Sequence, residues 1–330
     1  MQIVYISNRP EDLEGTLPYV RAFMGFVSEV VVFCPGAMVS RFQQTGASTV
    51  IDERDLLKDA YDDFRASKDH QKMNYMLRAS LSRHEHTAEE FLMSDDDSRP
   101  IVPVTPEFYK SEGKYHSYYF YTLEKWKGMA SKLPVQTSFD IGHFEELRLL
   151  RAHSMSTWMF SSHMPQIFNK ALFKECTDYF SPSLKDYSAI DEWGTYFNYA
   201  LSRHATRFHE PSIFRTLAWP HNPDSWPWQF SPPSFAFENF HEELYLPEGL
   251  FRGLKPRYDA ELHLPETLIK VRRYTEAYMN AKSYRAKLQG GAQGDLASNK
   301  PSSSALVARP TLWQRLRGGP GKTRSRPNLF

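Results

Sequence analysis

The first 57 residues alternate short apolar runs with stretches in which apolar residues recur at helical spacing. This alternation limits the folds open to the chain more than any other feature. Strands are predicted over residues 2–7, 29–34 and 48–51, with helices over residues 13–26 and 39–44. Strand, helix, strand, helix, strand in this order predicts the start of an α/β fold with an open parallel sheet covered by helices on both faces.

Polar residues follow the predicted strands of this sheet. Asn8 and Arg9 come directly after the first strand, and Asp52 comes directly after the third. The carboxyl ends of parallel strands meet at one edge, which is where ligands of open α/β sheets bind. The sequence therefore places Asn8, Arg9 and Asp52 along the same edge.

A helix is predicted over residues 69–84, with Asp69 as its N-terminal cap and apolar residues on one face. Arg78 lies on this helix and is a candidate phosphate contact, although an exposed helix face explains an arginine equally well. Further strands are expected over residues 115–121 and 158–160, and further helices over 166–179, 191–202 and 265–288.

Three adjacent carboxylates, Asp95, Asp96 and Asp97, close an apolar stretch over residues 91–93 that is typical of a buried strand. Three like charges at one strand end are costly unless a cation or strong donors neutralise them. If the strand continues, Asp95 and Asp97 share one face and are candidate ligands of Mg²⁺ or Mn²⁺. Asp96 then points away, toward an arginine or sugar hydroxyls. The alternative is an acidic surface turn.

Two later motifs carry candidate chemistry. His163 lies between a predicted strand and a proline-led helix, where it completes a metal shell, touches a phosphate, or only caps the helix. Asp191 and Glu192 begin another helix beside Trp193. Either acid is a candidate base for an acceptor hydroxyl, but acids at helix N-termini are also common for electrostatic reasons alone.

The parallel-sheet start with Asn8 and Arg9, followed by a helix and the Phe-Leu-Met-Ser-Asp-Asp-Asp run, resembles nucleotide-sugar glycosyltransferases of the GT-A fold. The resemblance covers about residues 1–215 and implies an α/β fold with a mixed, mostly parallel sheet covered by helices, followed by an irregular C-terminal extension. It implies that Asp95 and Asp97 hold a divalent cation on a donor diphosphate, with His163 as a third metal ligand. It further implies a nucleoside near Asn8, Arg9 and Asp52. Arg78 and Asp96, singled out above by their positions, are further candidate contacts to the donor.

Two alternatives stay open. The aspartates followed by His-x-Pro and a lysine-bearing helix also resemble the Stealth sugar-1-phosphate transferases, although the chain lacks their N-terminal tryptophan-valine-aspartate signature. A non-catalytic carbohydrate-binding protein is the second alternative. The favoured reading is transfer of a sugar from a nucleotide-diphosphate sugar to a carbohydrate or glycolipid acceptor, in surface polysaccharide or glycolipid synthesis.

Charge separates the body of the chain from its end. Of 40 basic residues, seven follow Asp295, which leaves 33 basic against 39 acidic residues before that point. A mildly acidic body argues against nucleic-acid binding. The basic tail, with Leu312-Trp313 in a short amphipathic piece, is a candidate for peripheral contact with an anionic membrane.

Two cysteines do not make a disulfide framework, and no apolar run is long enough to span a bilayer. We therefore expect a cytoplasmic protein, which could contact the inner face of the membrane peripherally. The predicted organisation is a catalytic domain over residues 1–220, an irregular wrapping segment with a helix over 221–288, and a flexible basic tail over 289–330.

Overall fold

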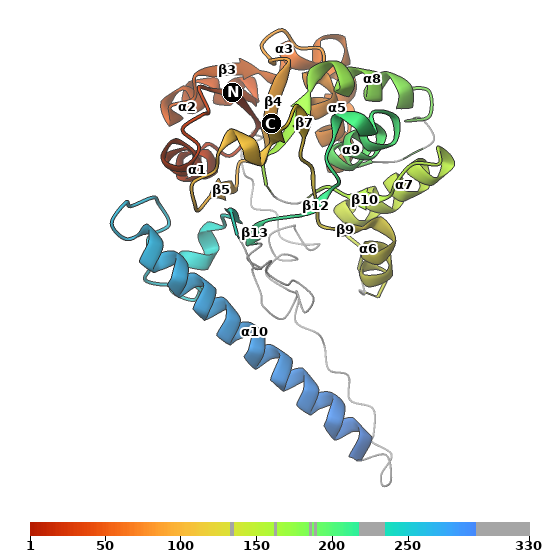
Figure 1. Cartoon of the computed structure of the whole chain (residues 1–330). Helices are drawn as coiled ribbons and strands as arrows, with labels where there is room; N and C mark the ends of the chain where they lie inside the picture. The colour runs from red at the N-terminus through yellow and green to blue at the C-terminus, as the bar shows by residue number, and fades with distance from the viewer. Residues whose placement is uncertain (133–134, 162–163, 185–186, 188–189, 218–234, 295–330) are drawn as a thin grey trace. The chain divides into compact units, whose positions relative to one another are not determined.

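The computed structural model of the chain describes residues 1–132, 135–161, 164–184, 187, 190–217 and 235–294 (Figure 1). The chain divides into two compact units, residues 1–277 and residues 278–330. Every element discussed below, apart from the end of the last helix, belongs to the first unit. Among the described residues, no helix combines the length and apolar character needed to cross a membrane.

A five-stranded sheet forms the centre of the first unit, in the order β11-β4-β1-β2-β3. Its strands are β1 (Gln2–Ile6), β2 (Glu29–Cys34), β3 (Thr49–Asp52), β4 (Glu90–Ser94) and β11 (Gln166–Asn169). β1 pairs in parallel with both β2 and β4, and β2 pairs in parallel with β3. Only β11 runs antiparallel within this sheet, alongside β4. The expected mixed, mostly parallel sheet is confirmed.

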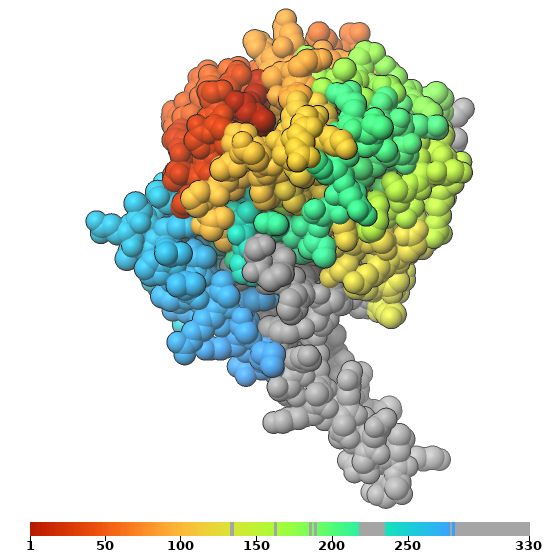
Figure 2. All heavy atoms as spheres, viewed as in Figure 1, coloured from red at the N-terminus to blue at the C-terminus, as the bar shows by residue number. Residues whose placement is uncertain are grey.

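The central strands are apolar because both of their faces are covered. Val4 of β1 pairs with Val31 on one side and Met93 on the other, and none of these side chains exceeds 1% exposure. Parallel strands buried on both faces lose the apolar–polar alternation of a half-exposed strand. On the face shown in Figure 2, atoms of the segments coloured red to green adjoin one another.

Three of the helices before β4 lie close to the predicted positions: α1 (Pro10–Phe23), α2 (Val39–Phe42) and α5 (His70–Leu81). Two short helices between them, α3 (Glu53–Leu57) and α4 (Tyr61–Ala66), were not predicted. α1 begins three residues earlier than expected because Pro10, at its first position, needs no hydrogen-bond acceptor. Asp69 caps α5 as predicted, accepting hydrogen bonds from the backbone of Gln71 and Lys72 at 3.0 and 3.1 Å.

Two expectations for the chain after β4 are wrong. The aromatic run over residues 115–121 is not one strand but falls on β7 (Lys114–Tyr115), β8 (Tyr118–Tyr119) and β9 (Tyr121–Thr122), each with a different partner. The predicted helix over 166–179 begins only at α8 (Lys170–Phe180), because Asn169 caps it by accepting from the Leu172 N–H at 3.0 Å. The four residues before α8 form β11 instead.

Four further helices complete the description. They are α6 (Leu123–Ala130), α7 (Ser138–Ala152), α9 (Glu192–Arg203) and α10 (His263–Gly294). The sequence did not predict α7, which begins with a reciprocal capping box between Thr137 and Asp140. Helices α5, α7 and α9 pack against one another, and α8 packs against α5, α9 and β11.

Smaller sheets extend this framework. β5 (Ser98–Pro100), β13 (Thr216–Leu217) and β14 (Phe237–Asn239) form a three-stranded sheet, and the remaining strands are β6 (Lys110–Ser111), β10 (Trp158–Met159) and β12 (Ser212–Ile213). Because β14 pairs with β5 directly after the three aspartates, a segment from late in the chain braces the turn that carries them.

Candidate functional site

The three aspartates occupy a turn beyond the carboxyl end of β4. The strand ends at Ser94, and the Ser98 N–H donates to the Asp95 carbonyl at 3.2 Å, which closes the turn before β5. The pleat alternation expected to separate Asp96 from its neighbours therefore does not operate here. The three side chains still differ, because each meets different groups.

Asp96 is buried and tied to the first strand and helix. Its carboxylate accepts a hydrogen bond from Ser7 Oγ at 2.5 Å and forms an ion pair with Arg9. Its backbone carbonyl accepts from Thr16 Oγ1 at 2.7 Å. These contacts join the ends of β1, the central strand of the sheet, and β4, its neighbour. Asp96 and Arg9 thus lie together at the carboxyl ends of β4 and β1.

Asp95 is linked to a second acid through a shared arginine. Arg78 of α5 donates to Asp95 Oδ1 at 2.6 Å and also pairs with Glu192 at the start of α9. The guanidinium carbon lies 5.5 Å from the ring centre of Trp193. The structure therefore brings three of the predicted site residues, Asp95, Arg78 and Glu192, into one chain of contacts.

Asp97 has the least satisfied carboxylate of the three. Its Oδ1 atom is buried and has no hydrogen-bond partner. Burial, together with the neighbouring carboxylates of Asp96 and Asp95, raises the pKa of Asp97 well above its usual range. A buried carboxylate oxygen without a donor is an unfavourable arrangement that a bound cation relieves.

Asp191 and Glu192 are both buried at the N-terminus of α9. Asp191 caps the helix, accepting from the Gly194 N–H at 2.7 Å and from Ser161 Oγ at 2.7 Å. Glu192 keeps one buried oxygen, Oε2, without a partner. Burial raises the pKa of Glu192 to about 7, against the opposing effect of Arg78. Both oxygens of Asp191 are thus occupied by structural hydrogen bonds, whereas Glu192 is less fully satisfied.

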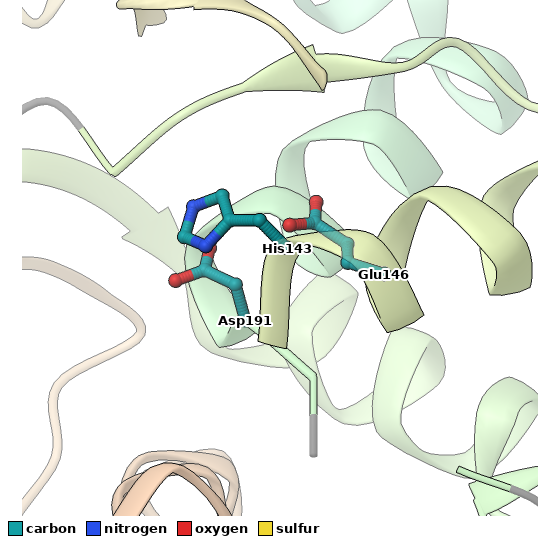
Figure 3. A group of neighbouring side chains, drawn as sticks. All are labelled: His143, Glu146 and Asp191. Atoms are coloured by element: carbon teal, nitrogen blue, oxygen red, sulfur yellow. The ribbon is translucent and has the colours of Figure 1, made fainter. Parts of the chain in front are cut away.

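Two residues of α7, His143 and Glu146, join this region and were missed in the sequence. Figure 3 shows both projecting from α7 toward Asp191. One potential ligand atom from each of the three residues lies within 4.8 Å of the others, and all three are buried. The sequence feature that could have indicated this pair is the i, i+3 spacing of His143 and Glu146, which places both on one face of a helix.

The predicted residues Asn8 and Asp52 lie on the same edge of the sheet, and Asn8 stands between Ser7 and Arg9, which both contact Asp96. Asn8 is exposed in the loop between β1 and α1. Asp52 ends β3, which is separated from β4 by β2 and β1, and its Oδ1 caps α3 by accepting from the Arg54 N–H at 2.9 Å. The predicted metal ligand His163 lies outside the described residues.

No family model matches the sequence, and no curated protein sequence matches it. Among solved structures, the chain is similar to an active-site mutant of LgtC, with a TM-score of 0.45 and 12% identity. The match covers 81% of this chain and 95% of the LgtC chain. It is similar to the galactosyltransferase LgtC in complex with donor and acceptor sugar analogues, with a TM-score of 0.42, 12% identity and coverage of 82% and 96%.

A third similar structure is mouse xyloside xylosyltransferase 1 in its apo form. Its TM-score is 0.41 at 8% identity, and the match covers 72% of this chain and 96% of that chain. Likenesses at such low identity concern the arrangement of the chain, so the roles of individual residues have to be argued from the contacts above.

Proposed function

We propose that this protein is a metal-dependent glycosyltransferase that moves a sugar from a nucleotide-diphosphate sugar to a hydroxyl group of a carbohydrate or glycolipid acceptor. The observation that carries the proposal is the aspartate turn at the carboxyl end of β4. It combines a buried carboxylate oxygen without a partner, on Asp97, with a second carboxylate, on Asp95, at the sheet edge where α/β proteins bind ligands.

The donor set of this turn fits Mg²⁺ or Mn²⁺. Both ions favour oxygen ligands, and sites for phosphorylated substrates commonly supply one or two carboxylates while the phosphates supply the rest. Asp95 and Asp97 would hold the ion. When bound, it neutralises charge on the departing diphosphate. Asp96 is engaged with Ser7 and Arg9, so it serves to position the turn.

The transfer itself requires one proton acceptor. As the acceptor oxygen bonds to the anomeric carbon, the bond from that carbon to the phosphate oxygen breaks, and the electron pair leaves with the nucleoside diphosphate. The hydroxyl proton passes to a carboxylate. Of the two candidate bases, Glu192 is favoured over Asp191, because Asp191 already uses both oxygens in the cap and the Ser161 hydrogen bond.

The test combines nucleotide binding with turnover for the variant Asp97→Asn. We expect nucleoside diphosphates to raise the melting temperature of the wild-type protein more when Mn²⁺ is present than when it is absent. In Asp97→Asn this Mn²⁺-dependent increase should disappear, and transfer should fall by about 100-fold or more, because an amide is a poor ligand for a hard cation. Asp62→Asn, an exposed aspartate of α4, is the matched control.

The outcomes separate the alternatives. Full activity in Asp97→Asn removes the metal proposal. A phosphorus-containing product with release of a nucleoside monophosphate identifies a Stealth-type sugar-1-phosphate transferase. Absence of any Mn²⁺-dependent effect across a panel of nucleoside diphosphates favours a carbohydrate-binding protein. The basic tail lies outside the described residues, and its contact with anionic membrane remains a prediction.

A further inference from the structure

The group formed by His143, Glu146 and Asp191 lies on other elements than the aspartate turn and has a different chemistry. It combines one imidazole with two carboxylates, from the middle of α7 and the N-terminus of α9. Glu146 has an exposed fraction of 0%, and neither of its carboxylate oxygens has a hydrogen-bond partner. A buried carboxylate in this state is strongly destabilising unless a proton or a cation neutralises it.

We propose that His143, Glu146 and Asp191 form a buried binding site for a divalent transition-metal ion, with Zn²⁺ as the first candidate. This site is separate from the Mg²⁺ or Mn²⁺ site proposed at Asp95 and Asp97, and its existence does not depend on the proposed glycosyl transfer.

The orientation of His143 supports this assignment. Its Nδ1 atom lies 2.9 Å from the Phe139 carbonyl oxygen and is therefore the ring nitrogen that donates. In the neutral imidazole, Nε2 then carries the lone pair, and Nε2 is the atom that faces Ser161 beside Asp191. A hydrogen bond from the second ring nitrogen to a backbone carbonyl is the usual way in which proteins orient a metal-binding histidine.

The charge of the surrounding groups and the type of ligand atoms indicate which class of metal ion the site binds. Glu146, Asp191 and Glu192 bring three buried carboxyl groups together, and Arg78 is the cation paired with one of them. A divalent ion compensates the remaining two. An imidazole ligand favours zinc and similar transition metals over magnesium, which prefers oxygen ligands and bound water.

The spacing also suits such an ion. Zinc bonds of about 2.0–2.2 Å to nitrogen and oxygen keep any two ligand atoms within about 4.4 Å of each other. The three ligand atoms already lie within 4.8 Å of one another, so small side-chain adjustments bring them into range. Metal binding would replace the contacts that Ser161 Oγ makes with Asp191 Oδ1 and His143 Nε2, while the second oxygen of Asp191 still caps α9. Gly194 makes room for Glu146, since a Cβ atom at that position would collide with the Glu146 carboxylate.

The experiment measures bound metal rather than activity. Because the site is buried, the full chain is unfolded and refolded either with Zn²⁺ or with a chelator, freed of loose metal by gel filtration, and analysed for metal per chain. We expect the wild-type protein to retain one Zn²⁺ and to melt several degrees higher than the protein refolded with chelator. Refolding with Co²⁺ should give visible absorption bands typical of an ion with nitrogen and oxygen ligands.

Matched variants locate the ion. Glu146→Gln and His143→Gln should lose the Zn²⁺ and the increase in melting temperature, whereas Glu145→Gln, on the same helix, should keep both. Asp97→Asn should also retain this Zn²⁺, which distinguishes the buried site from the proposed donor site. A wild-type chain that refolds without Zn²⁺ and without Co²⁺ absorption overturns the proposal. Undiminished metal in a folded Glu146→Gln variant does so as well.

Discussion

Two clusters of buried charge in the first unit differ in how fully their members are paired. In one, Arg99 and Lys270 both bond to Glu238: Arg99 Nε at 2.8 Å, and Lys270 Nζ at 2.8 and 3.2 Å from the two oxygens. Arg99 also donates to the Pro256 carbonyl at 2.7 Å and to Tyr245 Oη at 2.8 Å. We call this group the basic cluster.

The second, the acidic cluster, lies between the end of β4, α7 and the start of α9. Its carboxyl groups outnumber its two guanidinium groups, those of Arg9 and Arg78, and three of them hold buried oxygens without partners. The carboxyl groups are those of Asp95, Asp96, Asp97, Glu146, Asp191 and Glu192.

This difference in pairing suggests that the basic cluster stabilises the fold, whereas the acidic cluster binds ligands. A buried ion cluster in which every donor and acceptor is used holds elements together and has nothing left to bind. Unpartnered buried carboxylates instead reduce the stability of the empty protein, and they are retained where a cation or substrate completes them. The basic cluster holds the three-stranded sheet of β5, β13 and β14 against α10. The acidic cluster contains the residues of the proposed donor site and the candidate bases.

The largest effect is expected in the basic cluster. Glu238→Gln removes the carboxylate that both Arg99 and Lys270 contact, which leaves two cations buried without an anion. Breaking one partner of a buried ion pair costs about 3–5 kcal/mol. We therefore expect the free energy of unfolding, measured with urea, to fall by about this amount, while Glu242→Gln, at an exposed position nearby, changes it little. A loss no larger than in that control would show that the cluster is not structural.

The central sheet and its first helices are largely predictable from the sequence because their signals are local. The apolar residues of β1, β2 and β4 form continuous runs, and Asp69 stands directly before the helix it caps. β11 was not predictable in this way. Its Gln-Ile-Phe-Asn sequence is short, adjoins a strong helix, and becomes a strand by pairing with β4, more than 70 residues earlier in the chain.

The candidate site shows the same division between local and long-range information. The aspartate run is a contiguous motif and could be singled out directly. The roles of Arg78, His143 and Glu146 depend on α5 and α7 packing beside α9, which brings residues from distant parts of the sequence together. No local sequence pattern predicts that Glu146 lies beside Asp191. A histidine and a glutamate three positions apart are a common feature of exposed helices.

An effect of intermediate size is expected at the margin of the acidic cluster. Burial raises the pKa of Asp12 to about 6, although Arg9, at 2.8 Å, opposes the shift, and the carboxylates of Asp96 and Glu243 add to it. A carboxyl group with a raised pKa in the folded state favours folding below pH ~4 and loses this contribution as pH rises toward 6. Asp12→Asn should therefore increase stability above pH 6 and not below pH 4.

Allowing for partial solvent exposure, the gain for Asp12→Asn should be about 1–2 kcal/mol at pH 7–8. The measurement is the free energy of unfolding of wild type and variant across pH 4–8, with Asp62→Asn to report any general effect of removing one surface acid. A difference that stays constant over this range would show that the carboxyl group of Asp12 ionises in the folded protein as it does in the unfolded chain.

The smallest change in the free energy of unfolding is expected for Asp97→Asn, and its sign tests the role of Asp97. Asp97→Asn makes the same acid-to-amide exchange as Glu238→Gln, but it removes a carboxylate whose Oδ1 is buried without a donor and which lies beside two other acids. In the metal-free protein we expect the free energy of unfolding to stay the same or rise by about 1 kcal/mol, because a neutral amide relieves the repulsion. Stability kept or gained while transfer is lost would mean that Asp97 is retained for binding at a cost in folding. A loss approaching that of Glu238→Gln would instead assign Asp97 a structural role and remove the distinction between the two clusters.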